Sequence, residues 1–117
     1  MLRFPWPDSR LSPNSRKDHR YLTDVRTLAH QIGFAITRDA GLMLPMYGDL
    51  CWQLVFCPPD RRRRDLDNLY SSFKSTCDGI FAALQTDDSR IRRAVLEYGP
   101  LEPNGAVYIE IKKLESE

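Results

Sequence analysis

The stretch from Asp49 to Cys57 constrains the fold of this chain most, because it is largely apolar on both sides of an extended backbone. Its two alternating sets are Cys51, Gln53, Val55 and Cys57 against Trp52, Leu54 and Phe56. A strand that is apolar on both faces is typical of the interior of a covered sheet. Because the proline pair at 58–59 cannot continue a strand, the sequence predicts a central strand that ends at Cys57.

The rest of the chain alternates between strand-like and helix-like patterns of apolar residues. We predict strands over 2–6, 92–98 and 106–114, one helix from about 17 or 18 to 32, and another from about 68 to 84. Pro5 favours an edge position or an early end for the first strand, and Gly33 favours an end to the first helix. The order β-α-β-α-β-β predicts an α+β fold, with two main helices packed on one mixed sheet. We expect residues 1–117 to form one small domain.

The cysteines and the apolar runs indicate the compartment. Cys51 and Cys57 would lie about 20 Å apart on one strand, which is too far for a disulfide. Cys77 is the third cysteine, and we expect all three to be free core residues. No apolar run is long enough for a membrane helix, and residues 1–10 lack the apolar stretch of a signal peptide. We therefore expect a cytoplasmic protein with no membrane partner.

The net charge of +1 over 117 residues conceals an uneven distribution. Residues 1–93 hold 15 basic and 11 acidic side chains, whereas residues 94–117 hold 2 basic and 5 acidic ones. Four consecutive arginines, Arg61 to Arg64, form the densest basic cluster. Such a cluster is either a solvated face or a track for phosphate groups. The near-zero total therefore does not exclude a nucleic-acid partner.

Acidic residues follow the arginines directly. Asp65 and Asp67 would point to the same side of an extended backbone, with Leu66 toward the core. They could cap the helix that follows, or they could hold Mg²⁺, which prefers oxygen ligands and retains waters for a phosphate substrate. Asp87 and Asp88 come after that helix, which would be about 25 Å long. The two acidic groups can meet only if the next strand returns beside the helix.

Polar residues also form a stripe along the second helix, at Asp67, Ser71, Lys74 and Asp78. Helical side chains lean toward the N-terminus, so Lys74 would lean toward Ser71 and Asp67. The lysine could steady a scissile phosphate. It could equally form an ion pair with Asp78 four residues later.

These motifs together resemble one known family. The segments that carry the likeness are Phe4–Pro7, Ser12–Arg16, the run Pro59–Leu69 with its DLDN element in a basic context, and Asp87–Ile91. They resemble the RusA family of Holliday junction resolvases, which is common in prophages. The resemblance spans nearly the whole chain.

The resemblance implies roles for particular residues. Asp65, Asp67 and Asp88 would be the catalytic ligands of Mg²⁺, for which Mn²⁺ is a possible substitute, and Asp87 would support them. The family places a lysine four residues after the second acid, where this sequence has Ser71. The role would then pass to Lys74. By the same analogy the DNA-binding residues are Arg61, Arg62, Arg63, Arg64, Asn14 and Arg16.

The resemblance also implies an activity, which is the Mg²⁺-dependent resolution of four-way DNA junctions by paired incisions in recombination and repair. It implies a homodimer, and two symmetric cuts by a chain with one acidic constellation independently favour a two-fold dimer. An alternative is a branched-DNA-binding protein without cleavage, which the displaced lysine keeps open. A third interpretation is a globular interaction protein whose acids only cap a helix.

Overall fold

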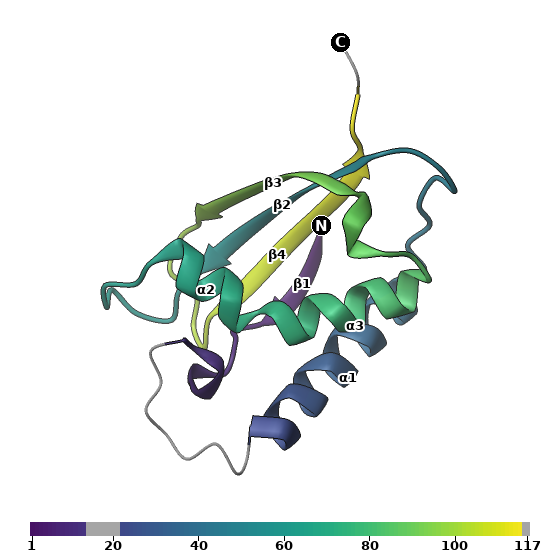
Figure 1. Ribbon diagram of the computed structural model, residues 1–117. Coiled ribbons are helices and arrows are strands. Elements are labelled where there is room, and N and C mark those ends of the chain that lie inside the picture. Colours follow the sequence, from purple (N-terminus) through teal and green to yellow (C-terminus); the bar gives the residue numbers. More distant parts are fainter. Residues whose placement is uncertain (14–21, 116–117) are drawn as a thin grey trace.

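The computed structural model describes residues 1–13 and 22–115, and its elements follow the predicted order (Figure 1). They are β1 (Leu2–Pro5), η1 (Ser9–Leu11), α1 (Leu22–Ala40), β2 (Leu50–Cys57), α2 (Leu66–Ser72), α3 (Lys74–Leu84), η3 (Asp88–Arg90), β3 (Ile91–Tyr98) and β4 (Ala106–Lys113). The chain is a small α+β domain in which three helices accompany one mixed four-stranded sheet.

The sheet has the strand order β1-β4-β2-β3, so β2 lies in its interior as predicted. β2 pairs with β3 in parallel and with β4 in antiparallel orientation. The parallel pair requires a crossover connection, and α2 and α3 supply it. β1 pairs only with β4, which confirms the edge position that Pro5 indicated.

The core lies between the sheet and the helices, which occupy one face of the sheet in Figure 1. Trp52, Leu54 and Phe56 of β2 are buried there together with Phe73 and Ile80. All three cysteines are free and buried, as predicted. On β3, one of the two edge strands, most side chains are exposed.

The first helix differs from the prediction, because α1 continues through Gly33 to Ala40. Gly33 faces α3, where a Cβ would lie 2.2 Å from the carbonyl oxygen of Thr76. Gly79 of α3 faces α1 in the same way, where a Cβ would lie 2.0 Å from the carbonyl oxygen of His30. Both glycines therefore serve a close contact between two helices. Gly41, with a φ of 63°, follows the end of the helix instead.

Candidate active site

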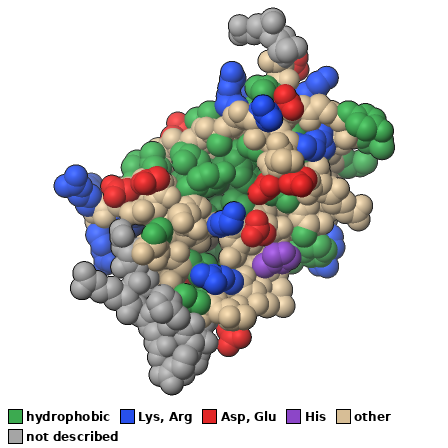
Figure 2. All heavy atoms as spheres, viewed as in Figure 1, with side chains coloured by type: hydrophobic (Ala, Val, Ile, Leu, Met, Phe, Trp, Pro, Cys, Tyr) green, Lys and Arg blue, Asp and Glu red, His purple; other side chains and the backbone are tan. Residues whose placement is uncertain are grey.

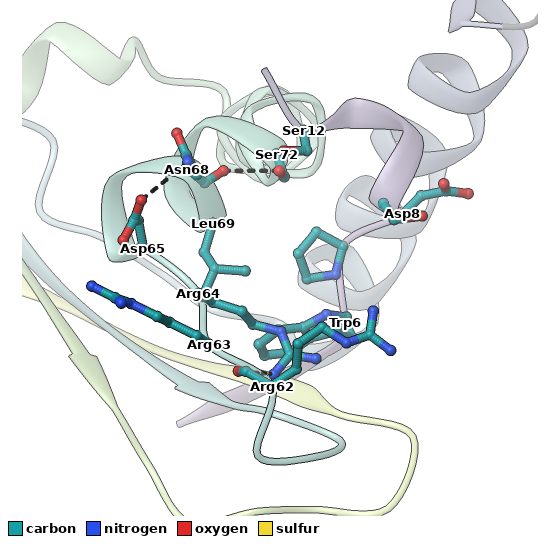
Figure 3. A pocket seen from close by; sticks show the side chains of 12 residues that line it. Trp6, Asp8, Ser12, Arg62, Arg63, Arg64, Asp65, Asn68, Leu69 and Ser72 are labelled. Carbon is teal, nitrogen blue, oxygen red and sulfur yellow. Dashed lines mark hydrogen bonds between the residues drawn. The ribbon is translucent and has the colours of Figure 1, made fainter. Parts of the chain in front are cut away.

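The loop after β2 is organised by one of its own arginines. We call residues 59–65 the arginine loop. The guanidinium group of Arg64 donates to the carbonyl oxygens of Asp60 and Arg62, at 3.1 and 2.9 Å, and to the Asp60 carboxylate at 2.8 Å. It also lies 5.4 Å from the centre of the Trp6 ring (Figure 3). Arg64 therefore holds the loop in shape.

Asp60 is the second internal anchor of the arginine loop. Its carboxylate accepts the backbone N–H of Arg62 at 2.9 Å in addition to the Arg64 side chain. Hydrogen bonds to the charged form lower the pKa of the Asp60 carboxyl, the one from Arg62 contributing most. The remaining arginines, Arg61, Arg62 and Arg63, are exposed. The structure thus separates four adjacent arginines into one internal strut and three outward cations.

The two carboxylates at the start of α2 could have capped the helix, but the Asp65 side chain forms no capping hydrogen bond. The helix begins at Leu66, so Asp67 is helical and only Asp65 has the extended backbone that we expected of both. Asp65 occupies the N-cap position but makes no capping hydrogen bond with its side chain. Its contact within the helix is a 3.5 Å interaction with the Asn68 amide. Asp67 is exposed, and no residue in the described segments pairs with it.

The predicted second helix is divided at Phe73, which separates α2 from α3. Phe73 is fully buried, and its ring packs edge-on against Phe4 and Phe56 at centroid distances of 6.0 and 6.2 Å. Its N–H is shared between the carbonyls of Leu69 and Tyr70. Lys74 consequently begins a new helix, and the predicted polar stripe is not continuous.

A second polar region lies between the two helices and β3. We call it the acidic groove. It is an open cavity of about 400 Å³ lined by Trp52, Tyr70, Ser71, Lys74, Cys77, Asp78, Phe81, Asp88, Ile91, Arg92 and Ala94. Aromatic and aliphatic side chains form its inner wall, whereas ionisable groups come from α3, η3 and β3. Such a combination is typical of ligand-binding clefts.

Asp88 of the groove and its neighbour Asp87 have unequal proton affinities. Asp87 accepts the backbone N–H of Ser89 at 2.9 Å, which lowers the pKa of the Asp87 carboxyl. The pKa of Asp88 is raised, first by its hydrogen bond with Asp87 and also by partial desolvation, while Lys74 opposes the rise. Within the described ranges Lys74 and Asp78 form no ion pair, so the lysine charge remains available.

The structure brings together only some of the predicted site residues. Lys74 and Asp88 line the acidic groove, whereas Asp65 lines a separate hollow of about 500 Å³ with Arg62, Arg63 and Arg64 (Figure 3). Figure 2 shows acidic side chains in separate places on this face, with hydrophobic surface between them. Among residues 1–13 and 22–115, no three His, Cys, Asp or Glu side chains are placed to hold one metal ion. Asn14 and Arg16 lie outside the described residues.

Two aromatic residues of the site were not predicted. Tyr98 closes β3, and its hydroxyl donates to the carbonyl oxygen of Arg64. Burial raises the pKa of Tyr98, and the nearby charges of Asp65 and Asp67 raise it further. Tyr70 packs edge-on against Trp52 in the groove. The strand and helix patterns placed both residues in regular elements, but no local signal distinguished them.

No family model matches the chain. An uncharacterized protein of Xylella fastidiosa (strain Temecula1) is 38% identical over 92 residues, which are 76% of this chain. The chain spans 60% of the length of that relative. In the described residues no helix is long and apolar enough to cross a membrane.

A second relative has a functional name. The crossover junction endodeoxyribonuclease rusA of Enterobacteria phage HK97 is 29% identical over 102 residues. The similarity covers 87% of this chain and 77% of the phage protein. The chain is therefore a distant relative of a phage crossover junction endodeoxyribonuclease.

Proposed function

We propose that the protein is a structure-selective endonuclease that resolves four-way DNA junctions in recombination and repair. The observation that carries the proposal is that Lys74 lines the acidic groove and forms no ion pair among residues 1–13 and 22–115. Over the same residues Asp67 is exposed and has no partner, and Arg61, Arg62 and Arg63 are exposed on the loop before α2. A pocket that combines an apolar wall with a few polar groups is a usual place for a ligand. The distant likeness to the phage HK97 enzyme supports the same activity.

The arginine loop would bind the DNA backbone. Arg61, Arg62 and Arg63 are exposed on a loop whose shape Arg64 maintains, so they can meet phosphates without disturbing the fold. Contacts of this kind position a duplex but do not read its sequence. This is consistent with recognition of DNA shape.

The donor chemistry fits Mg²⁺ in a loose site but not in a three-carboxylate cage. Mg²⁺ is usually held by one or two carboxylates, with waters and substrate phosphates completing its coordination. Asp65 and Asp67, at the start of α2, would supply those carboxylates. Asp88 lines the separate acidic groove, where Asp87 would support it through their hydrogen bond. When bound, such an ion activates water and neutralises charge on the phosphate. Mn²⁺ has similar ligand preferences and is the expected substitute.

The groove itself contributes electrostatics and proton affinity. Lys74 would place a positive charge near the phosphate that is attacked, which stabilises the charge that develops in the transition state. Asp88, with its raised pKa, would retain a proton to a higher pH than Asp87. The aromatic wall of Trp52 and Tyr70 would exclude water on one side.

Two coordinated cuts require two such sites, and we propose a homodimer with two-fold symmetry that supplies them. The exposed strand β3 forms one edge of the sheet and also lines the groove. We place the protein in the cytoplasm, where its DNA substrate lies.

The second candidate is a branched-DNA-binding protein without cleavage. Ser71 stands where the resemblance calls for a lysine, and the acids of the described residues form no three-ligand group. Such a protein would bind DNA through the arginine loop but would not hydrolyse the phosphodiester bond.

The test is cleavage of a synthetic four-way junction at low salt with Mg²⁺, against a matched linear duplex and an EDTA control. We expect paired nicks in the junction and no product with EDTA. Asp67→Asn should lose cleavage at least about 100-fold and keep binding. Asp24→Asn is the matched control, because Asp24 also lies exposed in the first turn of a helix.

Different failures have different meanings. Binding of the junction without cleavage in Mg²⁺ or Mn²⁺ would favour the non-catalytic candidate. Absence of junction binding at low salt would exclude both nucleic-acid functions. Equal loss of cleavage in Asp24→Asn would indicate a structural effect.

A further inference from the structure

The loop between α1 and β2 exposes large apolar side chains. We call residues 42–47 the methionine loop. Met43, Met46 and Tyr47 are 89%, 81% and 81% exposed, although Leu42 and Leu44 between and before them are half-buried. Isolated apolar residues on a surface need no explanation, but a cluster within a few residues indicates an interaction site.

The methionine loop is held in place by Arg90, the last residue of η3. The Arg90 guanidinium donates to the carbonyl oxygens of Pro45 and Gly48, at 2.8 and 3.0 Å, and to the Thr86 hydroxyl at 3.1 Å. Because η3 begins at Asp88, the same short element carries both the acid of the groove and the anchor of the loop. The exposed side chains are therefore presented at a fixed place relative to the acidic groove.

Positive charge flanks the base of the loop. β2 starts where the loop ends, and its residue Cys51 is in register with Arg93 on one side and Lys112 on the other. Lys113 is in register with Leu50. All three cations are exposed, whereas Asp49 is the one acid between the loop and β2. An apolar projection among cations suits an anionic partner that also offers apolar surface.

DNA at an opened branch point has this chemistry, since phosphates surround exposed base faces. Proteins that distort DNA insert apolar wedges, including methionine, leucine and proline, between base steps. Aromatic side chains such as tyrosine stack on unpaired bases. We propose that the methionine loop is a wedge that enters the branch point of the junction and unstacks the bases beside the phosphate in the groove. This inference rests on the proposed function.

The test uses the full chain and a four-way junction with 2-aminopurine beside the crossover. Unstacking raises 2-aminopurine fluorescence, so the wild type should raise it on binding. The double variant Met46→Ser/Tyr47→Ser should lose that rise and bind the junction about 10-fold more weakly. Met46→Leu should behave as the wild type, because leucine preserves the apolar wedge. Leu28→Gln is the control, since Leu28 is an exposed apolar residue on α1.

The outcomes separate this inference from the function beneath it. Wild-type cleavage without a fluorescence rise would overturn the wedge and leave the nuclease intact. A double variant that still gives the full fluorescence rise would also overturn the wedge. A double variant that is monomeric where the wild type is dimeric would overturn it too, because the loop would then serve the dimer contact. A wild type that neither binds nor cuts would overturn both. Unchanged thermal unfolding of the double variant, expected for such exposed residues, shows that any loss is not due to misfolding.

Discussion

The arginine loop and the acidic groove differ in how many of their charged side chains form ion pairs or hydrogen bonds within the protein. In the arginine loop, Arg64 and Asp60 satisfy each other and the surrounding backbone, and the loop gains a fixed shape. In the acidic groove, Lys74 forms no ion pair with any residue that the structure describes, and the hydrogen bond with Asp87 raises the pKa of the Asp88 carboxyl. In the first region some charges stabilise the loop while others are exposed, whereas in the second no ion pair among the described residues neutralises Lys74 or Asp88.

The largest effect should follow from removing the lysine of the groove. Lys74→Ala should slow junction cleavage by about 100-fold, because it removes a positive charge near the reacting phosphate. Ser71→Ala is the matched control, since Ser71 lines the same groove and occupies the position where a lysine was expected. Single-turnover rates under saturating protein would measure both. Wild-type rates in both variants would show that the lysine has no part in the chemistry.

The acidic groove also depends on the position of α3, whereas the arginine loop is anchored on Trp6 and Tyr98. Gly79→Ala should lower the free energy of unfolding by about 1–3 kcal/mol, because the new methyl group would meet the His30 carbonyl of α1. Ser75→Ala, on the same helix, should change it by less than about 0.5 kcal/mol. Urea unfolding with fluorescence detection would compare them. A Gly79→Ala variant as stable as the wild type would mean that the helices separate freely.

Local patterns could predict the elements whose own residues carry the signal. β2 was predicted because it is apolar on both faces, and β4 because apolar and polar residues alternate along it. The predicted end of the first helix was wrong because Gly33 is a typical helix terminator. Only its contact with Thr76 shows that the glycine allows α1 and α3 to approach closely. The division at Phe73 likewise depends on Phe4 and Phe56, which come from two distant strands.

The candidate site shows the same limit in its charges. The sequence does not distinguish the four adjacent arginines from one another. Only the contacts with Trp6 and Asp60 in the folded chain give Arg64 a role that differs from that of the other three. We stated the return of the next strand as the condition for the two acidic groups to meet. β3 does return beside the helices, but it brings Asp88 to Lys74, while Asp65 lines a different hollow. The metal ligands proposed from the resemblance remain a prediction.

A smaller effect should distinguish the two kinds of arginine. Arg64→Ala should lower the free energy of unfolding by about 1–2 kcal/mol, because it removes two hydrogen bonds to backbone carbonyls and a contact with Trp6. Arg63→Ala should leave stability unchanged and reduce the slope of log K against log salt by about 1, as expected for one lost phosphate contact. Thermal unfolding and junction binding across a salt series would measure the two effects. The comparison fails if Arg63 proves the more important for stability.

The smallest effect concerns Cys77, which lines the acidic groove without contributing charge. Burial is the largest cause that raises the pKa of the Cys77 thiol, and the nearby Asp78 raises it further. A raised pKa leaves little thiolate at pH 8, and the thiolate is the reactive form. Iodoacetamide should therefore modify Cys77 far more slowly in the native protein than in urea, as peptide mass spectrometry would show. Rapid native labelling would mean that solvent reaches the inner wall of the groove in the folded protein, and that this region is less tightly packed than its buried residues indicate.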